Sequence, residues 1–430
     1  MGLPPRAPVI ATRCAKVTAV FGMRCLAVNP LHLSQFTATT CLGRGLAANL
    51  AALREERSGL APCRFETVDV DTCVGEVAGV DDESLLPAVT DFDCRNNRLA
   101  QLGLAQDDFI AGVAAARARY GADRIGVFVG TSTSGILQTE LAYRRRDFVT
   151  GALPDDFVYS TTQNSFSVAD FVRRTLRLSG PAAAISSACS SSAKAFGSAA
   201  RMIEVGLIDA AVVGGVDSLC LTTLYGFSSL QLTSARPCRP FDRDRDGLSI
   251  GEAAAFFLIE RLPAVTSPDA ILLLGVGESS DAYHMSSPHP DGMGARMAME
   301  QALAGAGLAP EAIDYINLHG TGTRSNDLVE GRAVLSLFGD ATRCSSTKGS
   351  VGHTLGAAGG VEAAFSALAL RHGFMPAGVN MRELDPALPL AYLLRNEARA
   401  PSRVLSNSFG FGGTNCSLVL GRAEAVIGGA

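Results

Sequence analysis

Apolar positions along most of the chain follow two alternating patterns, that of an amphipathic helix and that of a buried strand. Residues 42–55 and 107–120 carry apolar side chains at helical spacing. Residues 125–130, Ile-Gly-Val-Phe-Val-Gly, form a short apolar run, which is typical of a strand buried on both faces. Because such segments alternate from about residue 31 onward, we predict an α/β fold with a parallel sheet covered by helices.

One arrangement of strand, turn and helix occurs twice. Residues 182–204 run from an apolar strand through a serine-rich turn into a helix of small residues, and residues 343–370 repeat the turn and the helix. Prolines and small polar residues at 261–268 separate a strand predicted at 253–260 from one predicted at 271–276. We therefore predict two related halves, residues 31–262 and 263–430, whose loops meet in a shared cleft at the strand ends.

The first 30 residues differ from this pattern. Arg6, Arg13, Lys16 and Arg24 are interleaved with apolar residues, and the longest apolar run, residues 17–23, is short for a signal peptide and has no clear cleavage site. No segment of the chain approaches the length of a membrane span. We expect a loosely ordered extension at residues 1–30, with no secretion signal and no assigned function.

Composition narrows the class of protein. The 430 residues are 47% hydrophobic, enough for a large core, and a net charge of -5 provides no overall basic field for nucleic acid. The 11 cysteines are scattered without close pairs of the metal-binding type, and a chain of this size does not need disulfides. We expect reduced thiols, a cytoplasmic location, no metal and no nucleic-acid partner.

Cys189 lies between the strand and the helix of the first repeat, in the sequence Ser-Ala-Cys-Ser-Ser-Ser. A thiol at a helix N-terminus is close to the positive end of the helix dipole and to free backbone N–H groups, which favours the thiolate and hence a nucleophile. A free cysteine is more often a small buried residue. Cys189 considered alone would therefore be assigned to the core.

Two of the six histidines lie in loops rich in glycine, serine and threonine. His319 follows an apolar strand in Asn-Leu-His-Gly-Thr-Gly-Thr, and His353 ends the sequence Lys-Gly-Ser-Val-Gly-His before another helix. A single histidine is more often structural, but two in such loops favour a functional role. A cysteine with two histidines suits acyl transfer, because the thiolate can accept an acyl group while the imidazoles polarise a carbonyl.

Four blocks, in this order, resemble the signature motifs of the elongating β-ketoacyl-acyl carrier protein synthases. These are thiolase-superfamily condensing enzymes of fatty acid and polyketide synthesis. The blocks are residues 187–190, 317–323, 348–359 and 407–415. The resemblance extends over residues 31–420 and implies a thiolase fold, in which two duplicated halves form five layers, α-β-α-β-α, normally as a homodimer.

The resemblance also implies catalytic roles. Cys189 would accept the acyl group, and His319 and His353 would hydrogen-bond the thioester carbonyl of malonyl-carrier protein as carbon dioxide leaves. The product would be a chain extended by two carbons. Lys348 would support His353 electrostatically, and Glu330 would be the acidic residue that pairs near Lys348. Without the motifs, both charged residues would be interpreted as ordinary solvated side chains.

Further positions would bind the carrier protein and its phosphopantetheine arm, on which the substrates arrive without a bound cofactor. The backbone N–H of Phe411 would join that of the nucleophile in an oxyanion hole, and the Phe411 ring would act as a gate. Thr321 and Thr323 would hydrogen-bond the arm. Arg95 and Arg98 match docking positions for an acidic carrier protein and share one face if residues 93–103 are helical, although a solvated helix face explains them equally well.

Differences from the family pattern suggest a specialised pathway. Gln231 stands where many elongating synthases have a docking arginine, and condensing enzymes of aryl-polyene or polyketide pathways show the nearest resemblance. The chain would then be one subunit of a heteromeric synthase that needs a chain-length-factor partner. A non-catalytic partner subunit is a second alternative, but such subunits generally lack the cysteine. A cysteine hydrolase is a third, but it leaves Lys348 and the second histidine unexplained.

Overall fold

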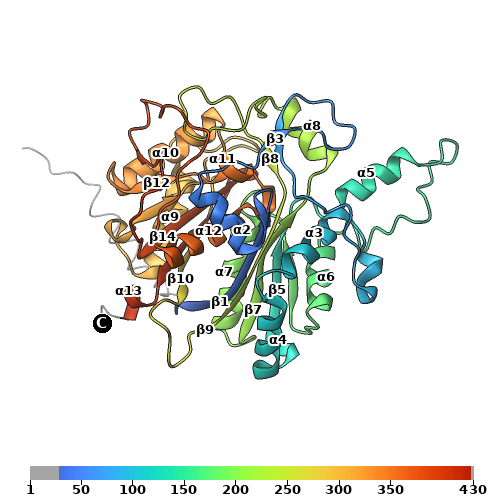
Figure 1. Ribbon diagram of the computed structural model, residues 1–430, viewed down its shortest axis with the longest axis horizontal. Coiled ribbons are helices and arrows are strands. Elements are labelled where there is room, and N and C mark those ends of the chain that lie inside the picture. Colours follow the sequence, from blue (N-terminus) through green and yellow to red (C-terminus); the bar gives the residue numbers. More distant parts are fainter. Residues whose placement is uncertain (1–28, 428–430) are drawn as a thin grey trace, which may run out of the picture.

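The computed structural model describes residues 29–427, so the predicted extension at residues 1–30 lies almost entirely outside the described residues. A 12-stranded sheet runs through the molecule, and β3, β4 and β8 form a small second sheet (Figure 1). The strands of the large sheet are β1 (Leu31–Thr40), β2 (Gly43–Arg44), β5 (Ile125–Gly130), β6 (Ala182–Ile185), β7 (Ala210–Asp217), β9 (Ala253–Arg261), β10 (Ile271–Ser280), β11 (Tyr315–Asn317), β12 (Arg343–Ser345), β13 (Ala391–Tyr392), β14 (Arg403–Gly410) and β15 (Thr414–Arg422). The small sheet contains β3 (Ala61–Pro62), β4 (Cys73–Gly75) and β8 (Ile250–Gly251).

The large sheet consists of two halves with the same topology. The order β6-β5-β7-β9-β1 begins with three parallel strands and ends with two antiparallel pairings, and β12-β11-β14-β15-β10 repeats this order and these directions. The two halves meet where Leu31 and His32 of β1 pair with Leu273 and Leu272 of β10. This repeat confirms the predicted duplication.

Helices cover both faces of each half in the predicted α-β-α-β-α arrangement. They are α2 (Gly45–Arg54), α3 (Arg95–Leu104), α4 (Phe109–Tyr120), α5 (Ile136–Arg144), α6 (Ser167–Thr175), α7 (Ser191–Glu204), α8 (Leu221–Ser229), α9 (Met293–Ala306), α10 (Arg324–Phe338), α11 (Lys348–Val351), α12 (Ala358–His372) and α13 (Glu424–Ile427). Helices α7 and α12 lie between the halves and share one hydrophobic core with strands of both. Helices α3, α4 and α6 cover one outer face, and α9 and α10 cover the other.

Small residues allow the two central helices to approach closely. A Cβ atom added to Gly359 of α12 would lie 2.7 Å from the Cβ and the backbone nitrogen of Ala193 in α7. The next residue, Gly360, donates its N–H to the hydroxyl of Ser192 at 2.9 Å. This contact brings together the N-terminal ends of α7 and α12, and thus the turns that carry Cys189 and His353.

The sequence pattern predicted element types better than their first residues. The strand at residues 125–130 has the predicted bounds. The helix predicted at residues 42–55 begins only at Gly45, because residues 43 and 44 pair with β1 as β2. The helix predicted at residues 107–120 begins at Phe109, because Asp107 and Asp108 have left-handed φ angles of 55° and 54°.

Candidate active site

Cys189 lies in a tight turn between β6 and α7. Ala188, directly before it, has a φ of 51°, in the left-handed region that side chains rarely adopt. The Ser191 hydroxyl holds this turn by donating to the carbonyl of Ala188 and accepting the N–H of Ser187. The turn presents the Cys189 thiol, in a residue only 6% exposed, to an internal pocket.

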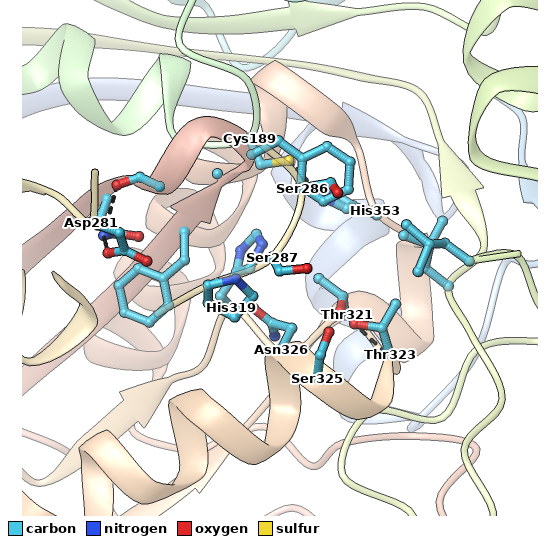
Figure 2. Close-up of a pocket in the computed structure, with 18 of the residues that line it drawn as sticks. Cys189, Asp281, Ser286, Ser287, His319, Thr321, Thr323, Ser325, Asn326 and His353 are labelled. Carbon is cyan, nitrogen blue, oxygen red and sulfur yellow. Dashed lines mark hydrogen bonds between the residues drawn. The ribbon is translucent and has the colours of Figure 1, made fainter. Parts of the chain in front are cut away.

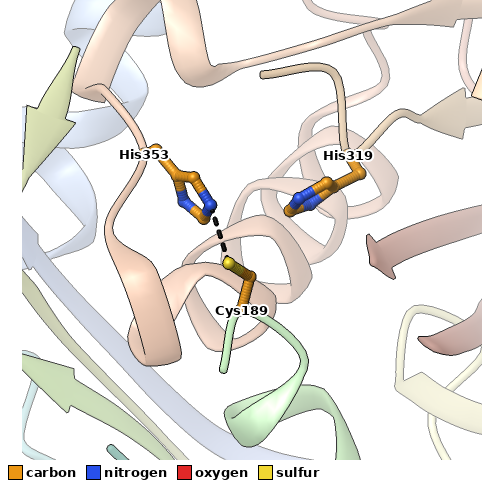
Figure 3. A group of neighbouring side chains, drawn as sticks. All are labelled: Cys189, His319 and His353. Carbon is orange, nitrogen blue, oxygen red and sulfur yellow. Dashed lines mark hydrogen bonds between the residues drawn. The ribbon is translucent and has the colours of Figure 1, made fainter. Parts of the chain in front are cut away.

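The two predicted histidines converge on this thiol (Figure 3). His353 Nε2 lies 3.0 Å from Cys189 Sγ. The rings of His319 and His353 meet edge to face, with centroids 5.2 Å apart and planes at 84°. One ligand atom from each of the three residues lies within 4.8 Å of the others. The structure therefore brings together all three residues of the predicted acyl-transfer set.

The pocket beside this cluster is built from both halves of the fold (Figure 2). Its lining includes Cys189, Phe227, Leu232, Leu248, Asp281, Ser286, Ser287, Pro288, His319, Thr321, Thr323, Ser325, Asn326, His353, Phe409, Phe411 and Asn415. Thr321 and Thr323 share a hydrogen bond of 2.9 Å between their hydroxyls. The cysteine thus lies in a pocket with an apolar side near Phe227 and a hydroxyl-rich side near the threonines.

Both histidines are neutral and carry their proton on Nε2. Burial is the main cause that lowers both pKa values well below the ordinary range, and the charge of Lys348 adds to it. Lys348 Nζ donates to Nδ1 of His319 at 3.2 Å, and the N–H of Leu355 donates to Nδ1 of His353 at 3.2 Å. Since Nδ1 accepts in each neutral ring, Nε2 must hold the hydrogen. Two N–H donors are therefore available beside the thiol.

The thiol itself is less acidic than its place before a helix suggested. Burial raises the pKa of Cys189 to about 11, although Lys348 and the backbone N–H of Phe411 oppose the shift. Burial therefore opposes the thiolate that the helix end favours, and the activation of Cys189 by the helix end stays a prediction. Desolvation outweighs the nearby positive groups because the cysteine is removed from water.

Phe411 lies close to the nucleophile through its backbone and to the pocket through its ring. Its backbone N–H lies close enough to the Cys189 thiol to lower the thiol pKa, and its part in an oxyanion hole stays a prediction. Its ring packs on Phe227 of α8 at a centroid distance of 5.6 Å. Gly412 follows with a φ of 76° and leaves open space where a Cβ would be. The backbone of this loop is therefore free of side-chain bulk next to the pocket.

The charged residues behind the histidines are paired differently from the prediction. Lys348 forms its buried ion pair with Glu362 of α12, not with Glu330. Glu330 instead accepts the N–H groups of His319 at 2.8 Å and Gly320 at 2.7 Å. Burial raises the pKa values of both Glu330 and Glu362 to about 7. Glu330 thus holds the His319 loop, and Lys348 contacts His319 rather than His353.

Comparison with known proteins agrees with this arrangement. Residues 19–264 match the beta-ketoacyl synthase N-terminal domain, and residues 271–382 match the beta-ketoacyl synthase C-terminal domain. The chain belongs to the beta-ketoacyl synthase family. The 3-oxoacyl-acyl-carrier-protein synthase 2 of Rhizobium meliloti is 38% identical over 314 residues, which cover 69% of this chain and 74% of that protein. The mitochondrial 3-oxoacyl-acyl-carrier-protein synthase of Arabidopsis thaliana is 40% identical over 258 residues, 56% of each protein.

Solved structures show the same family and fold. The ketosynthase ApeO in complex with its chain length factor ApeC, from Xenorhabdus doucetiae, gives a TM-score of 0.82 at 40% identity, covering 92% of this chain and 98% of that one. The ishigamide ketosynthase/chain length factor gives a TM-score of 0.82 at 28% identity, covering 92% of this chain and 100% of that one. The resemblance to condensing synthases and the thiolase fold are confirmed.

One predicted docking residue of this synthase is not available to a partner. Arg95 is 1% exposed and forms ion pairs with Glu252, Glu76 and Asp81. The expectation that Arg95 contacts a carrier protein is therefore wrong, because its side chain lies inside the N-terminal half. Arg98 is partly exposed and pairs with Asp93, and its role in docking stays a prediction.

Sequence reasoning missed Glu362, which carries the counter-charge of the active-site lysine. A signal was available, because Glu362 is the only acidic residue in the apolar stretch 349–370. A lone carboxylate in a buried helix needs a cation or several donors. The structure supplies the cation, Lys348, and one further donor, the Ser408 hydroxyl.

In residues 29–427 of this synthase, Cys189, His319 and His353 are the one group placed to hold a metal ion. The Lys348 ammonium, 3.2 Å from His319 Nδ1, opposes a second cation there, and the absence of a metal from the reaction stays a prediction. No helix in this same range is both long and apolar enough to span a membrane.

Proposed function

We propose that this beta-ketoacyl synthase is an elongating acyltransferase, which takes an acyl group on Cys189 and condenses it with malonyl-carrier protein. The observation that carries the proposal is the convergence of two Nε2–H donors, from His319 and His353, beside Cys189 Sγ. Two neutral donors at one point suit a developing oxyanion. Neither is required to act as a base in this proposal.

In the first step Sγ, which accepts the Nε2–H of His353 as its negative charge develops, attacks the acyl thioester of the carrier's phosphopantetheine arm. The oxyanion accepts the backbone N–H groups of Cys189 and Phe411, the bond to the arm's sulfur breaks, and the proton from the Cys189 thiol ends on the released arm. Thr321 and Thr323 hydrogen-bond the arm. Both acyl groups arrive on carrier protein, so the proposal needs no bound cofactor.

In the second step the malonyl thioester loses carbon dioxide. The electron pair of the broken carbon–carbon bond forms an enolate, whose oxygen accepts the Nε2–H groups of His319 and His353. His353 is available because acylated Sγ no longer competes for its proton. The enolate carbon then attacks the acyl carbonyl, a new carbon–carbon bond forms, and Cys189 leaves as thiolate. The chain grows by two carbons.

The test is Cys189→Ala with acyl-carrier protein and malonyl-carrier protein. Intact mass spectrometry should show an acyl adduct on Cys189 of the native enzyme and a β-ketoacyl product on the carrier. The variant should show neither. Condensation retained by Cys189→Ala would contradict the proposal, and release of free acid by the native enzyme would favour a cysteine hydrolase.

We infer that the synthase works as a pair of ketosynthase-fold chains, either a homodimer or a heterodimer with a chain length factor. Helix α5 and the loop after it extend from the body (Figure 1) and expose Phe148 at 87% and Val149 at 95%. Strand β6 ends the sheet and leaves an edge open. The complexes of ApeO and of the ishigamide ketosynthase with chain length factors support the heterodimer. Co-expression with such a subunit, followed by light scattering, distinguishes the two pairings.

The cytoplasm is the proposed location of the enzyme. The cysteines of the described residues are all free thiols, which suits a reducing compartment. Fractionation of the producing cells would test it, and recovery of the protein in an oxidising compartment would contradict it.

A further inference from the structure

Asp217 is a fully buried carboxylate that the proposed reaction does not use. It ends β7, and its side chain is 0% exposed. Its oxygens accept hydrogen bonds from the hydroxyls of Thr131, Ser132 and Thr133, from the N–H groups of Ser132 and Thr133, and from the N–H of Gly356. All of these donors are neutral. Burying a charge this completely is costly unless many donors hold it, so the cluster is a built feature of the fold.

The Asp217 cluster joins the two halves of the molecule. Thr131, Ser132 and Thr133 follow β5 in the N-terminal half, while Gly356 belongs to the C-terminal half and lies three residues after His353. A Cβ atom on Gly356 would lie 2.7 Å from Asp217 Oδ2 and 2.8 Å from the backbone nitrogen of Ser132. Only glycine permits this approach. Asp217 therefore fixes the backbone that follows the catalytic histidine.

Leu355 connects this fixed point to the histidine ring. Its φ is 53°, a left-handed conformation that leucine adopts only when its neighbours impose it. In that conformation its N–H donates to Nδ1 of His353 at 3.2 Å. The next peptide group joins Leu355 to Gly356, and its N–H donates to Asp217. Asp217 thus holds Leu355 in the conformation that serves His353.

We propose that Asp217 is a positioning residue that sets the tautomer of His353. By binding Gly356 it keeps the Leu355 N–H on Nδ1, which keeps the ring proton on Nε2. That proton faces Cys189 Sγ at 3.0 Å between nitrogen and sulfur. The inference rests on the proposed acyl transfer to Cys189, because it assigns a purpose to this donor.

A purely electrostatic role for Asp217 predicts the opposite result. Burial is the main cause of the raised pKa of the Cys189 thiol, and the charge of Asp217 adds to the shift. Removing that charge would therefore ease formation of the thiolate and speed acylation. Loss of positioning would slow acylation instead, since a displaced catalytic group can cost about 10²-fold in rate.

The experiment compares Asp217→Asn with the native enzyme by two measurements. The first is the rate of acylation of Cys189 by acyl-carrier protein, followed by intact mass spectrometry; we expect kcat to fall about 10- to 100-fold with little change in KM. The second is the ¹⁵N spectrum of histidine-labelled protein, which has six histidines to resolve. The His353 signals should change from a pure Nε2–H form to a mixture of tautomers.

A milder variant and a matched control complete the test. Ser132→Ala removes a hydroxyl that bonds Asp217 Oδ2 at 2.6 Å, so it should shift both measurements in the same direction by less, even if Asp217→Asn fails to fold. Asp314 directly precedes β11, at the end of that strand away from His319. Its carboxylate accepts the N–H groups of Ser402 and Arg403, and Asp314→Asn serves as the control. It should change neither measurement.

Unchanged tautomers and acylation in the folded Asp217 and Ser132 variants would overturn the inference. Faster acylation, or an equal loss in Asp314→Asn, would also overturn it. The proposed function fails separately, if native enzyme with a pure Nε2–H signal does not become acylated.

Discussion

The two strand, turn and helix repeats supply Cys189 and His353, and they differ in the length of the turn that carries each residue and in the groups that hold it. In the N-terminal repeat, residues 186–190 join β6 to α7, and the turn is held by neutral hydrogen bonds from serines. In the C-terminal repeat, residues 346–357 join β12 to α12 and include α11 and a 3-10 helix. That longer turn carries His353 and the buried Lys348, which pairs with Glu362.

This difference shows how two copies of one repeat can take on different chemical roles. A short turn suffices to place one thiol at the end of a helix, but it has no room for charged support. The longer turn of the second repeat places a cation and a proton donor behind the same pocket. The N-terminal half thus supplies the group that forms the covalent bond, and the C-terminal half supplies the two histidines and Lys348.

The largest expected effect is a loss of stability when the buried ion pair of the second repeat, Lys348 with Glu362, is removed. Lys348→Met leaves Glu362 buried without its cation, which should lower the free energy of unfolding by about 3–5 kcal/mol. The matched change in the other repeat, Ser190→Ala, removes only a neutral hydrogen bond and should cost about 1 kcal/mol. Urea unfolding measures both.

Burial raises the pKa of Glu362 and Lys348 opposes this shift, so removal of Lys348 raises the pKa further, and the Lys348→Met penalty should shrink as the pH falls from 8 to 6. The carboxyl group is then largely protonated and carries no charge. Equal costs for Lys348→Met and Ser190→Ala would contradict the distinction between the two turns.

The next effect separates the histidines. His319→Ala should slow condensation by about 10²- to 10³-fold while leaving acylation of Cys189 almost unchanged, because the hydrogen bond to Sγ comes from His353. His353→Ala should slow both steps. Single-turnover acylation, followed by mass spectrometry, and β-ketoacyl formation give the two rates. Equal losses of acylation in both variants would show that the two rings are not specialised.

A smaller effect concerns the contact that brings the repeats together. Gly359→Ala places a Cβ 2.7 Å from Ala193, and overpacking of this kind should cost about 1–3 kcal/mol. In the exposed part of α8, Gly226→Ala meets nothing within 4 Å, so it should stabilise the protein by about 0.5–1 kcal/mol. Thermal or urea unfolding compares the pair. Similar stabilities for the two variants would mean that the helices are not in tight contact.

The last effect is a pH dependence of thiol reactivity that changes neither turn. Since the pKa of the Cys189 thiol is about 11, the thiolate fraction should rise about tenfold for each pH unit between 7 and 9. Alkylation of Cys189 by iodoacetamide, quantified by peptide mass spectrometry, should follow this slope. A plateau below pH 8 would show that the helix end lowers the thiol pKa more than burial raises it.

The sequence predicted correctly those turns whose conformation is determined by residues adjacent in the chain. The turns before α7 and α12 were predicted because glycine, serine and apolar spacing are local signals. Arg95 was misassigned because its spacing from Arg98 defines a helix face without showing which face is buried. Glu252, which pairs with Arg95, is far away in the chain.

The environment of the site depended on contacts between distant segments. Cys189 is adjacent in sequence to a helix end, but its raised pKa comes from burial by both halves of the fold. Glu362, and not the expected Glu330, pairs with Lys348, because residue spacing does not show which carboxylate is buried beside the lysine. Asp217 ends an apolar strand in the sequence, and only the folded chain shows that Gly356 lies beside it.

The position of β1 matters for chimeras that combine halves of two different synthases. It belongs to the N-terminal half, yet its first two described pairs, Leu31 with Leu273 and His32 with Leu272, continue the sheet into the C-terminal half. A chimera joined between residues 262 and 271 would place a foreign β10 against the native β1. Such an exchange must therefore preserve the fit of these two pairs, in addition to the core contacts of α7 and α12.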